Sequence, residues 1–447
     1  MIAEPQAFGA AGTELPTTLF RKVNQPLGRE MKTEANTSKV RFPDSLGAFM
    51  STTPVLGRSD GVLFGVDLCV KDNIAVKGQP FTAGHPLFAE RRGLTTSPAV
   101  ERLLQSGARL VGMTRTDSGG FGVTSPGVEN PVLPGRSVGG SSGGAAAAVA
   151  AGLADLGLGT DTGGSIRIPA ACTGLFGFKP SIGRVPTDGV WPLAPSFDHV
   201  GLLSRELPVL CVAARALLNE RQIEGDVRYS SRETASSIKP ATDRPLAIAI
   251  EDAVPWYGEP GIRASMRKVK LGLLQAGHKL KRAKLPNLDQ LADAFSCLVL
   301  SEAREFYEHL STKDRSNLGP AARRALSVKF DHSDLVRAGA IASRASTAIE
   351  ACLADVDVLL TPTLFLTPPR HGEHRVNRDG RSMPIVHAFL ASTCFANVAG
   401  VPALAMPMER RVEALPFSLH LTARRDQDFE LFGIAERLLR DCRNDPT

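Results

Sequence analysis

Several features that mark common protein classes are missing from this chain of 447 residues. It has no run of about 18 consecutive apolar residues, which excludes a typical transmembrane helix. Its first residues lack the basic-then-apolar pattern of a secretion signal. The seven cysteines are dispersed, odd in number and without CxxC spacing, so we expect reduced thiols and neither a disulfide framework nor a zinc site. These absences predict a cytoplasmic protein with no membrane partner.

Motifs that bind nucleotides or nucleic acids are missing as well. No Gly-Lys-Ser/Thr step follows the glycine-rich loops, as a phosphate-binding P-loop requires. Gly157 and Gly159 have the wrong spacing to the next glycines for a dinucleotide fingerprint. The net charge of +6 is modest, and we interpret the basic stretch from Arg263 to Lys284 as the solvated face of a helix. We therefore expect no metal, no cofactor and no nucleic-acid partner.

The most informative segment is rich in glycine and serine. Residues 139–170 read GGSSGGAAAAVAAGLADLGLGTDTGGSIRIPA, in which Ser141 and Ser165 each follow a Gly-Gly pair. Glycine lets a substrate approach main-chain N–H groups closely. A hydroxyl nucleophile beside free backbone amides suits attack on a carbonyl, because the amides can hold the oxyanion that forms. A phosphate cradle and a plain turn are the alternative interpretations.

A nucleophilic serine needs a base, and Lys71 is the best candidate. It follows the apolar run Val62 to Val70, which reads as a buried strand. Burial lowers the pKa of a lysine and leaves a neutral amine that can accept a proton; a drop of about three units corresponds to roughly 4 kcal/mol. By itself such a lysine is more often a surface residue with a buried stem, and the serine loop favours the base. The nine histidines are scattered; we expect structural roles for His85 and His199, with substrate contact as the alternative for His85.

Three separated motifs carry a family resemblance. KDN at Lys71, GGSSGG at Gly139 and GTDTGGSIRIPA at Gly159 occur in this order, with Ser141 and Ser165 standing 24 positions apart. Together they resemble the amidase signature family of serine hydrolases. Similar pieces extend the resemblance over nearly everything after Gly61, and the AGHP turn and SFDHVG look most like the branch that contains indole-acetamide hydrolases. The further pieces are GFKPSIGRVPTDGV, SFDHVGLLSR, DVLLTPT and NVAGVPALAMP.

The resemblance implies a role for each matching residue. Ser165 would be the nucleophile, Lys71 the base, and Ser141, after a cis peptide bond, the relay between them. One departure is Ser118-Gly119, which stands where the family often has an acidic residue. The main-chain N–H groups of the oxyanion hole and the supporting side chains would come from Thr162, Gly163, Gly164, Asp161, Arg167, Ser142 and Thr160, with Asp161 and Arg167 paired across the loop.

The function expected from the resemblance is hydrolysis of a small carboxylic amide to an acid plus ammonia or an amine, through an acyl-enzyme. One alternative is a glutamine-amidase subunit of a tRNA-dependent amidotransferase. Another is a catalytically silent member that acts as a binding or scaffold module. The expected partner is the small-molecule amide itself, with a homodimer as a further possibility.

At 447 residues the chain exceeds the roughly 250 to 300 residues at which a single core stops growing. Strand and helix patterns alternate, and together with the resemblance they predict an α/β fold with a central mixed β-sheet covered by helices on both faces. We expect an irregular segment over 1–45 and an amidase domain over 46–447. That domain would hold a catalytic core at about 60–205 and a helical region covering the cleft at about 255–355.

Individual elements follow from the same patterns. Strand 62–70, helix 98–106 and strand 109–113 form a βαβ-like unit, and a helix opens at 143–151 after the first serine loop. Residues 220–244 are polar and read as an exposed connection. The remaining expected elements are strands at 245–250, 356–361, 403–408 and 417–421, and helices at 261–276, 287–309 and 333–354.

Overall fold

The computed structural model describes residues 44–220, 238, 244–250, 258–378, 380–409 and 416–442. The chain divides into two units, Met1–Thr37 and Ser38–Thr447. Nearly all of the expected irregular segment 1–45 and most of the expected connection 220–244 lie outside the described residues. The elements below all belong to the second unit.

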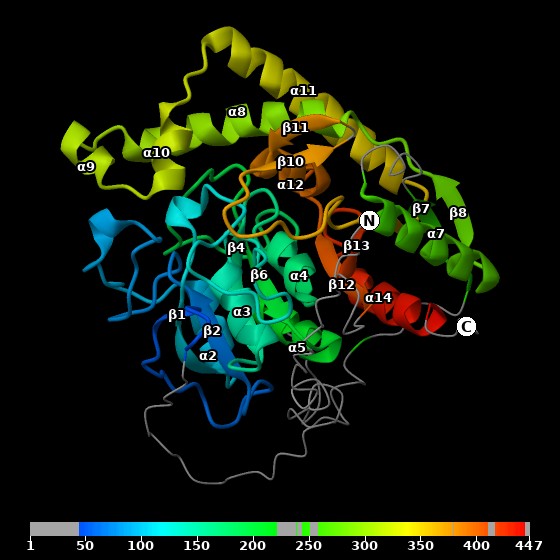
Figure 1. Ribbon diagram of the computed structural model, residues 1–447. Helices are drawn as coiled ribbons and strands as arrows, with labels where there is room; N and C mark the ends of the chain where they lie inside the picture. Colours follow the sequence, from blue (N-terminus) through cyan, green and yellow to red (C-terminus); the bar gives the residue numbers. More distant parts are fainter. Residues whose placement is uncertain are drawn as a thin grey trace, which may run out of the picture. The chain divides into compact units, whose positions relative to one another are not determined.

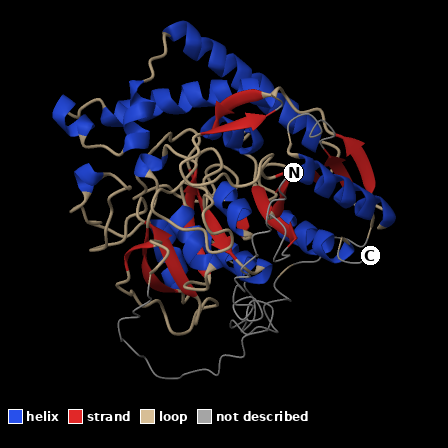
Figure 2. Cartoon of the chain, in the orientation of Figure 1, coloured by secondary structure: helices blue, strands red, loops and turns tan. Residues whose placement is uncertain are grey.

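A mixed sheet of eleven strands runs through this unit (Figures 1 and 2). Its strand order is β1-β3-β2-β4-β6-β5-β12-β13-β9-β7-β8. Strand β2 is parallel to β3 and β4, and β7 is parallel to β8 and β9, while the other neighbours are antiparallel. The strands are β1 (Phe49–Ser51), β2 (Asp67–Lys71), β3 (Arg109–Thr114), β4 (Leu156–Asp161), β5 (Phe176–Lys179), β6 (His199–Ser204), β7 (Ala247–Ile250), β8 (Lys279–Arg282), β9 (Val358–Pro362), β12 (Ala403–Glu409) and β13 (Phe417–Thr422), with a separate hairpin of β10 (Arg375–Arg378) and β11 (Arg381–Pro384).

Helices begin where the sequence carries start signals. Prolines occupy the first turns of α2, α5, α7 and α10, where a missing N–H costs nothing. Asp331 and Asp334 form a reciprocal capping box at the start of α11. The helices are α2 (Pro98–Gln105), α3 (Gly143–Ala150), α4 (Arg167–Thr173), α5 (Leu207–Leu217), α7 (Pro260–Gln275), α8 (Leu288–Tyr307), α9 (Thr312–Ser316), α10 (Pro320–Ser327), α11 (His332–Leu353), α12 (Ile385–Thr393), α13 (Phe395–Val398) and α14 (Glu430–Asp441), with 3₁₀ turns η1 (Pro86–Phe88) and η2 (Ser118–Gly120).

Both faces of the sheet are covered, as the alternation of side chains along a strand requires. On β2, Leu68 and Val70 belong to one core and Cys69 to another. The first core is shared with α2, α5, α7 and α14, and the second with α3 and α4. On the β7 side, Ile248 faces the first core, whereas Ala249 packs with α8, α11 and α13. The α/β fold with a central mixed sheet is therefore confirmed.

Three local expectations need correction. The apolar run 62–70 is a strand only from Asp67, because Gly65 adopts φ 86° and the preceding residues turn, while Leu63 is buried within the turn. The basic stretch is one helix followed by a strand: β8 pairs only with β7, and its lysines mark an exposed sheet edge. Helix α7 packs into the core on the face opposite to α8 and α11, so it does not belong to the expected cleft-covering group. None of the helices in the described ranges has the length and apolar character needed to cross a membrane.

Candidate active site

Lys71 ends strand β2, and its side chain is fully buried beside strand β4. These strands are parallel, with Val70 opposite Leu158, so their carboxyl ends meet at one edge of the sheet. Thr160 of β4 therefore lies beside Lys71, with 2.7 Å between Lys71 Nζ and Thr160 Oγ1. Asn73 donates a hydrogen bond from Nδ2 to the same hydroxyl oxygen at 3.1 Å. One strand thus presents the amine, and its neighbour holds it in place.

The amine of Lys71 also contacts the hydroxyl of Ser141, with 2.8 Å between Nζ and Oγ. The peptide bond between Gly140 and Ser141 is cis, as the resemblance implied. The hydroxyl of Thr116 donates to the carbonyl of Ser141 at 2.8 Å, which anchors the loop on the segment after β3. Two residues that are 70 positions apart in the chain are therefore in hydrogen-bonding contact.

Burial sets the charge state of this amine. It lowers the pKa of Lys71 to about 7, against the smaller opposing effects of Asp72, Asp117, Asp161 and Asp198. Burial also raises the pKa of Asp72 to about 6 and the pKa of Asp117 to about 7. A neutral amine near pH 7 has a lone pair that can accept a proton.

The second serine loop, residues 162–165, connects β4 to α4. The hydroxyl of Thr393 in α12 donates to the carbonyl of Gly163 at 2.6 Å. Gly164 has φ 139°, and a Cβ added there would lie 2.3 Å from the Thr393 hydroxyl oxygen. Both the backbone conformation and the close approach of α12 therefore require glycine at this position.

The backbone N–H groups of this loop are available to a ligand. Within the ranges that the structure describes, the N–H groups of Gly163, Gly164 and Ser165 form no hydrogen bond. The next N–H, that of Ile166, is bound to Asp161 Oδ2 at 3.2 Å. Successive free donors beside a hydroxyl suit stabilisation of an oxyanion.

Ser142 joins the two serine loops. Its N–H donates to the carbonyl of Ser165 at 3.2 Å, and its hydroxyl donates to the carbonyl of Thr160 at 3.2 Å. Helix α3 begins at the next residue and packs against the sheet. Ser142 therefore ties both serine loops to the strand that holds Lys71.

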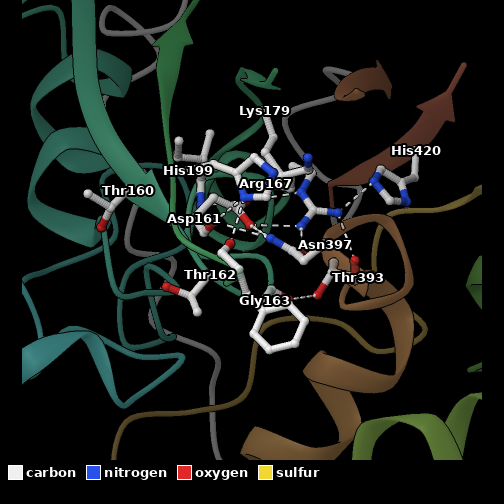
Figure 3. A network of polar contacts seen from close by, with 12 residues as sticks. Thr160, Asp161, Thr162, Gly163, Arg167, Lys179, His199, Thr393, Asn397 and His420 are labelled. Atoms are coloured by element: carbon white, nitrogen blue, oxygen red, sulfur yellow. Dashed lines mark hydrogen bonds and ion pairs between the residues drawn. The ribbon is translucent and has the colours of Figure 1, made fainter. Parts of the chain in front are cut away.

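A buried ion pair fixes the start of α4 (Figure 3). The guanidinium of Arg167 donates to Asp161 from Nε at 3.0 Å and from Nη2 at 2.8 Å, and both side chains are fully buried. Arg167 Nη1 donates to the carbonyl of Thr393 at 2.8 Å, and Nη2 donates to Asn397 Oδ1 at 2.6 Å. His420 Nε2 lies 2.9 Å from Arg167 Nη1. The pairing expected across the loop is present, and it extends to α12, α13 and β13.

The electrostatics of this network keep the ion pair charged. Burial alone would raise the pKa of Asp161, but the charge and hydrogen bonds of Arg167 outweigh it and hold that pKa well below its usual range. Burial lowers the pKa of His420 well below its usual value, and the guanidinium beside it acts in the same direction. A neutral His420 can accept from Arg167 without adding a second positive charge.

Several residues of the site escaped the sequence argument. Thr160, expected as a supporting hydroxyl, touches the Lys71 amine directly. Asp198 accepts from the Thr162 hydroxyl at 2.5 Å and from the N–H of Leu193 at 2.9 Å. Short-range patterns carry no signal for such partners, because they come from distant segments. Asn397 lies in a segment quoted for the resemblance, whereas no motif marked Asp198, Thr393 or His420.

The two histidines considered from the sequence lie in different surroundings. The ring of His85 is buried, with its Nε2 2.9 Å from the hydroxyl of Tyr307. His199 Nδ1 lies 2.6 Å from the carbonyl of Phe197, so this ring satisfies a turn. Among the described residues there is no group of three or more His, Cys, Asp or Glu side chains that could hold a metal ion.

Comparison with known proteins gives a consistent result. The family described as Amidase matches residues 40–432. The 2-amino-5-chloromuconic acid deaminase of Comamonas testosteroni is 30% identical over 405 residues, covering 88% of this chain and 84% of that protein. One of the glutamyl-tRNA(Gln) amidotransferase subunits of Methanospirillum hungatei is 29% identical over 432 residues, covering 88% of this chain and 96% of that protein.

The fold has solved counterparts. The crystal structure of an amidase matches with a TM-score of 0.74 and 30% sequence identity. The match covers 84% of this chain and 84% of the other. The central mixed sheet and its helical layers are thus shared with a solved amidase.

Proposed function

This chain belongs to the amidase family, and from that membership we propose that it hydrolyses a small carboxylic amide through Ser165, Ser141 and Lys71. The family places the reaction among hydrolyses of carbon–nitrogen bonds. The single observation that carries the triad is the contact of 2.8 Å between the buried Lys71 Nζ and Ser141 Oγ, within a site that lowers the pKa of the lysine to about 7. An amine in this state can draw a proton from a hydroxyl.

In the first half of the reaction, neutral Lys71 takes the proton of Ser141 while Ser141 takes the proton of Ser165. The Ser165 oxygen attacks the amide carbonyl and forms a bond to its carbon. The resulting oxyanion is held by the free N–H groups of Gly163, Gly164 and Ser165, with that of Thr162 as a further donor. Collapse of the intermediate breaks the carbon–nitrogen bond, and the leaving nitrogen receives the proton back from Lys71 through Ser141.

In the second half, water attacks the acyl group on Ser165 and gives its proton to the same relay. The same N–H groups hold the second oxyanion. The ester bond then breaks, Ser165 regains its proton, and the carboxylic acid leaves. Asp161 and Arg167 act through the shape of the loop, because their charges are spent on each other and on α12 and α13.

The test is substitution of the nucleophile and of the base. We expect Ser165→Ala to abolish ammonia release and labelling by a fluorophosphonate probe. We expect Lys71→Ala to remove most activity, since removing one member of such a set costs about 10⁴-fold or more in kcat. Aryl-acetamides, short aliphatic amides, malonamide-like diamides and urea derivatives form the substrate panel.

Ser343→Ala is the matched control, because Ser343 lies exposed in α11. This variant should keep full labelling and full turnover. Full turnover in the Ser165→Ala or Lys71→Ala variant would refute the mechanism. A silent binding module, the alternative without chemistry, predicts no labelling of the wild-type protein.

A second candidate function comes from the relatives named as amidotransferase subunits. Under it, the chain would release ammonia from glutamine as part of a complex. Glutaminase activity that appears only after partner subunits are added would favour this function, whereas turnover of small amides by the isolated chain favours the first. A homodimer and a cytoplasmic location stay predictions.

A further inference from the structure

An aromatic cluster lies beside the serine loops. We define it as His85, Phe88, Phe121, Trp191 and Tyr307, all of which lie within short range of another ring of the set. Its centre is Tyr307, whose ring centroid lies 5.6 Å from that of His85, 5.8 Å from that of Phe121 and 6.2 Å from that of Trp191. The chain has only three tyrosines and two tryptophans, so one of each stands at this place.

The hydroxyl of Tyr307 is held by two donors. Trp191 Nε1 donates to it at 2.9 Å, and His85 Nε2 lies 2.9 Å away. The N–H of Gly319 points at His85 Nδ1 at 3.5 Å. Because an N–H can only donate, Nδ1 is an acceptor and the proton of the neutral ring sits on Nε2. Burial lowers the pKa of His85 to about 4, which keeps the ring neutral near pH 7.

This arrangement leaves the hydroxyl proton of Tyr307 unused. The oxygen accepts from Trp191 and from His85, and no acceptor for the O–H occurs among the described residues. The side chain is only 2% exposed. A buried hydroxyl proton without an acceptor is costly unless a ligand or a water supplies one.

A strip of bare backbone leads from Tyr307 to the catalytic hydroxyls. A Cβ added to Gly119 would lie 2.8 Å from the Tyr307 hydroxyl oxygen. A Cβ added to the next residue, Gly120, would lie 3.6 Å from Ser141 Oγ and 3.7 Å from a methyl group of Leu193. Both glycines have positive φ, 66° and 79°. A side chain at either position would therefore fill the space that separates the tyrosine from the relay serine.

The surroundings of the oxyanion loop are apolar. A Cβ at Gly163 would lie 2.7 Å from Phe295 Cε1 of α8 and 2.7 Å from Leu390 Cδ2 of α12. Phe121 and Leu193 add to this apolar border. A charged acyl group would lose its hydration here without gaining a partner, whereas an apolar group is favoured.

We propose that Tyr307 determines substrate specificity: its hydroxyl donates a hydrogen bond to an acceptor atom on an uncharged, apolar acyl group that lies across Gly119 and Gly120. This inference rests on the proposed amide hydrolysis and deepens it by naming the substrate class. An amide whose acyl group is a flat ring with a nitrogen or oxygen acceptor fits this description. A hydrogen bond that replaces an unused buried donor is worth about tenfold in kcat/KM.

The experiment compares phenylacetamide with its three pyridyl isosteres, 2-, 3- and 4-pyridylacetamide. They have nearly the same shape and differ in the position of one acceptor atom. We measure kcat/KM for each in the wild-type protein and in Tyr307→Phe, which removes only the hydroxyl. At least one pyridyl isomer should lose about tenfold relative to phenylacetamide in the variant, because only that isomer used the hydroxyl. The same relative rates in both proteins for all three isomers would overturn the proposal.

Binding supplies a readout that does not need turnover. In Ser165→Ala combined with Trp256→Phe, Trp191 is the only tryptophan left, and its fluorescence reports ligands that reach Tyr307. The pyridyl isomer should bind about tenfold more weakly, relative to phenylacetamide, once Tyr307→Phe is added. If the wild-type protein hydrolyses none of these amides but this difference in binding is found, the proposed reaction fails while the specificity role stands.

Tyr307→Phe leaves two buried N–H donors without their acceptor, so its folding is checked by thermal denaturation. Trp191→Phe is the second variant. It removes one of the two donors that orient the hydroxyl, and we expect a smaller loss of the same preference in kcat/KM. An unchanged preference in that folded variant would also count against the proposal.

Discussion

Two buried lysines, Lys71 and Lys179, each have a pKa that burial lowers to about 7, but they touch different groups. The amine of Lys71 contacts the hydroxyl of Ser141. The amine of Lys179 donates to the backbone carbonyls of Pro180 and Val401, both at 2.8 Å. A carbonyl has no proton to give, so only Lys71 is placed to exchange one with a neighbour.

This difference leads to a prediction about pH. If neutral Lys71 is the base, kcat/KM should rise as the pH passes through about 7 and then level off, because the amine becomes neutral above its pKa. Steady-state rates between pH 5 and pH 9, on whichever amide of the panel is turned over, measure the midpoint. An ordinary lysine would give a midpoint near about 10.4.

Lys179→Met is the matched control for that profile. It removes the other buried lysine with a similar pKa while leaving the contacts of Lys71 intact, so the midpoint should stay where it is. Lys71→Arg should be inactive at every pH of the series, because a guanidinium does not lose its proton in this range. A midpoint that disappears in Lys179→Met would assign the titration to the wrong lysine.

At the scale of the element, the turn η2 depends on Asp117. Its Oδ2 accepts from the N–H of Gly122 at 2.5 Å, which closes the turn that carries Gly119 and Gly120. The side chain is buried, and burial raises its pKa to about 7. An asparagine could accept the same hydrogen bond through its amide oxygen.

We predict that Asp117→Asn gains stability relative to the wild-type protein as the pH rises. Between about pH 4 and pH 7 the unfolded Asp117 ionises while the folded one stays protonated, so the wild-type protein loses stability over this window. Asparagine has no such loss, and the difference in unfolding free energy should grow by up to about 4 kcal/mol. Urea unfolding at pH 4, 5.5 and 7.5 measures it. A difference that is constant across these pH values would contradict the raised pKa.

The elements also show where sequence patterns succeed. The helix expected at 333–354 is α11 (His332–Leu353), because its capping box lies within the sequence pattern itself. The strand expected at 62–70 begins five residues late, since a buried turn and a buried strand share the same apolar composition. The expected position of 261–276 over the cleft was wrong, because an amphipathic pattern shows that a helix packs but not on which face of the sheet.

At the scale of the whole molecule, Arg167 connects the serine loop to the last quarter of the chain. It contacts Asp161 six residues before it, and it reaches Thr393, Asn397 and His420 across 226 to 253 positions of sequence. All these groups are buried. The shape of the serine loop is therefore held by elements that fold onto it from far along the chain.

We predict that Arg167→Met destabilises the fold by about 3 to 5 kcal/mol, because it leaves the Asp161 carboxylate buried and unpaired. Urea unfolding measures the loss, and kcat/KM should fall with the order of the loop. The double variant Asp161→Asn with Arg167→Met should recover part of the stability, since it contains no unpaired charge. Equal stability of Arg167→Met and the wild-type protein would show that the ion pair does not hold this region.

The sequence by itself determined the α/β class, the positions of most elements and the three motifs that lead to Lys71, Ser141 and Ser165. It could do so because periodicity, prolines, caps and glycine loops act over a few residues. Tertiary structure alone decided which side chains surround those residues. The parallel pairing of β2 with β4 puts Thr160 against Lys71, and the approach of α12 and α13 brings Thr393 and Asn397 to the serine loop. Contacts of this kind depend on burial and on strand register across hundreds of positions, and no local pattern carries that information.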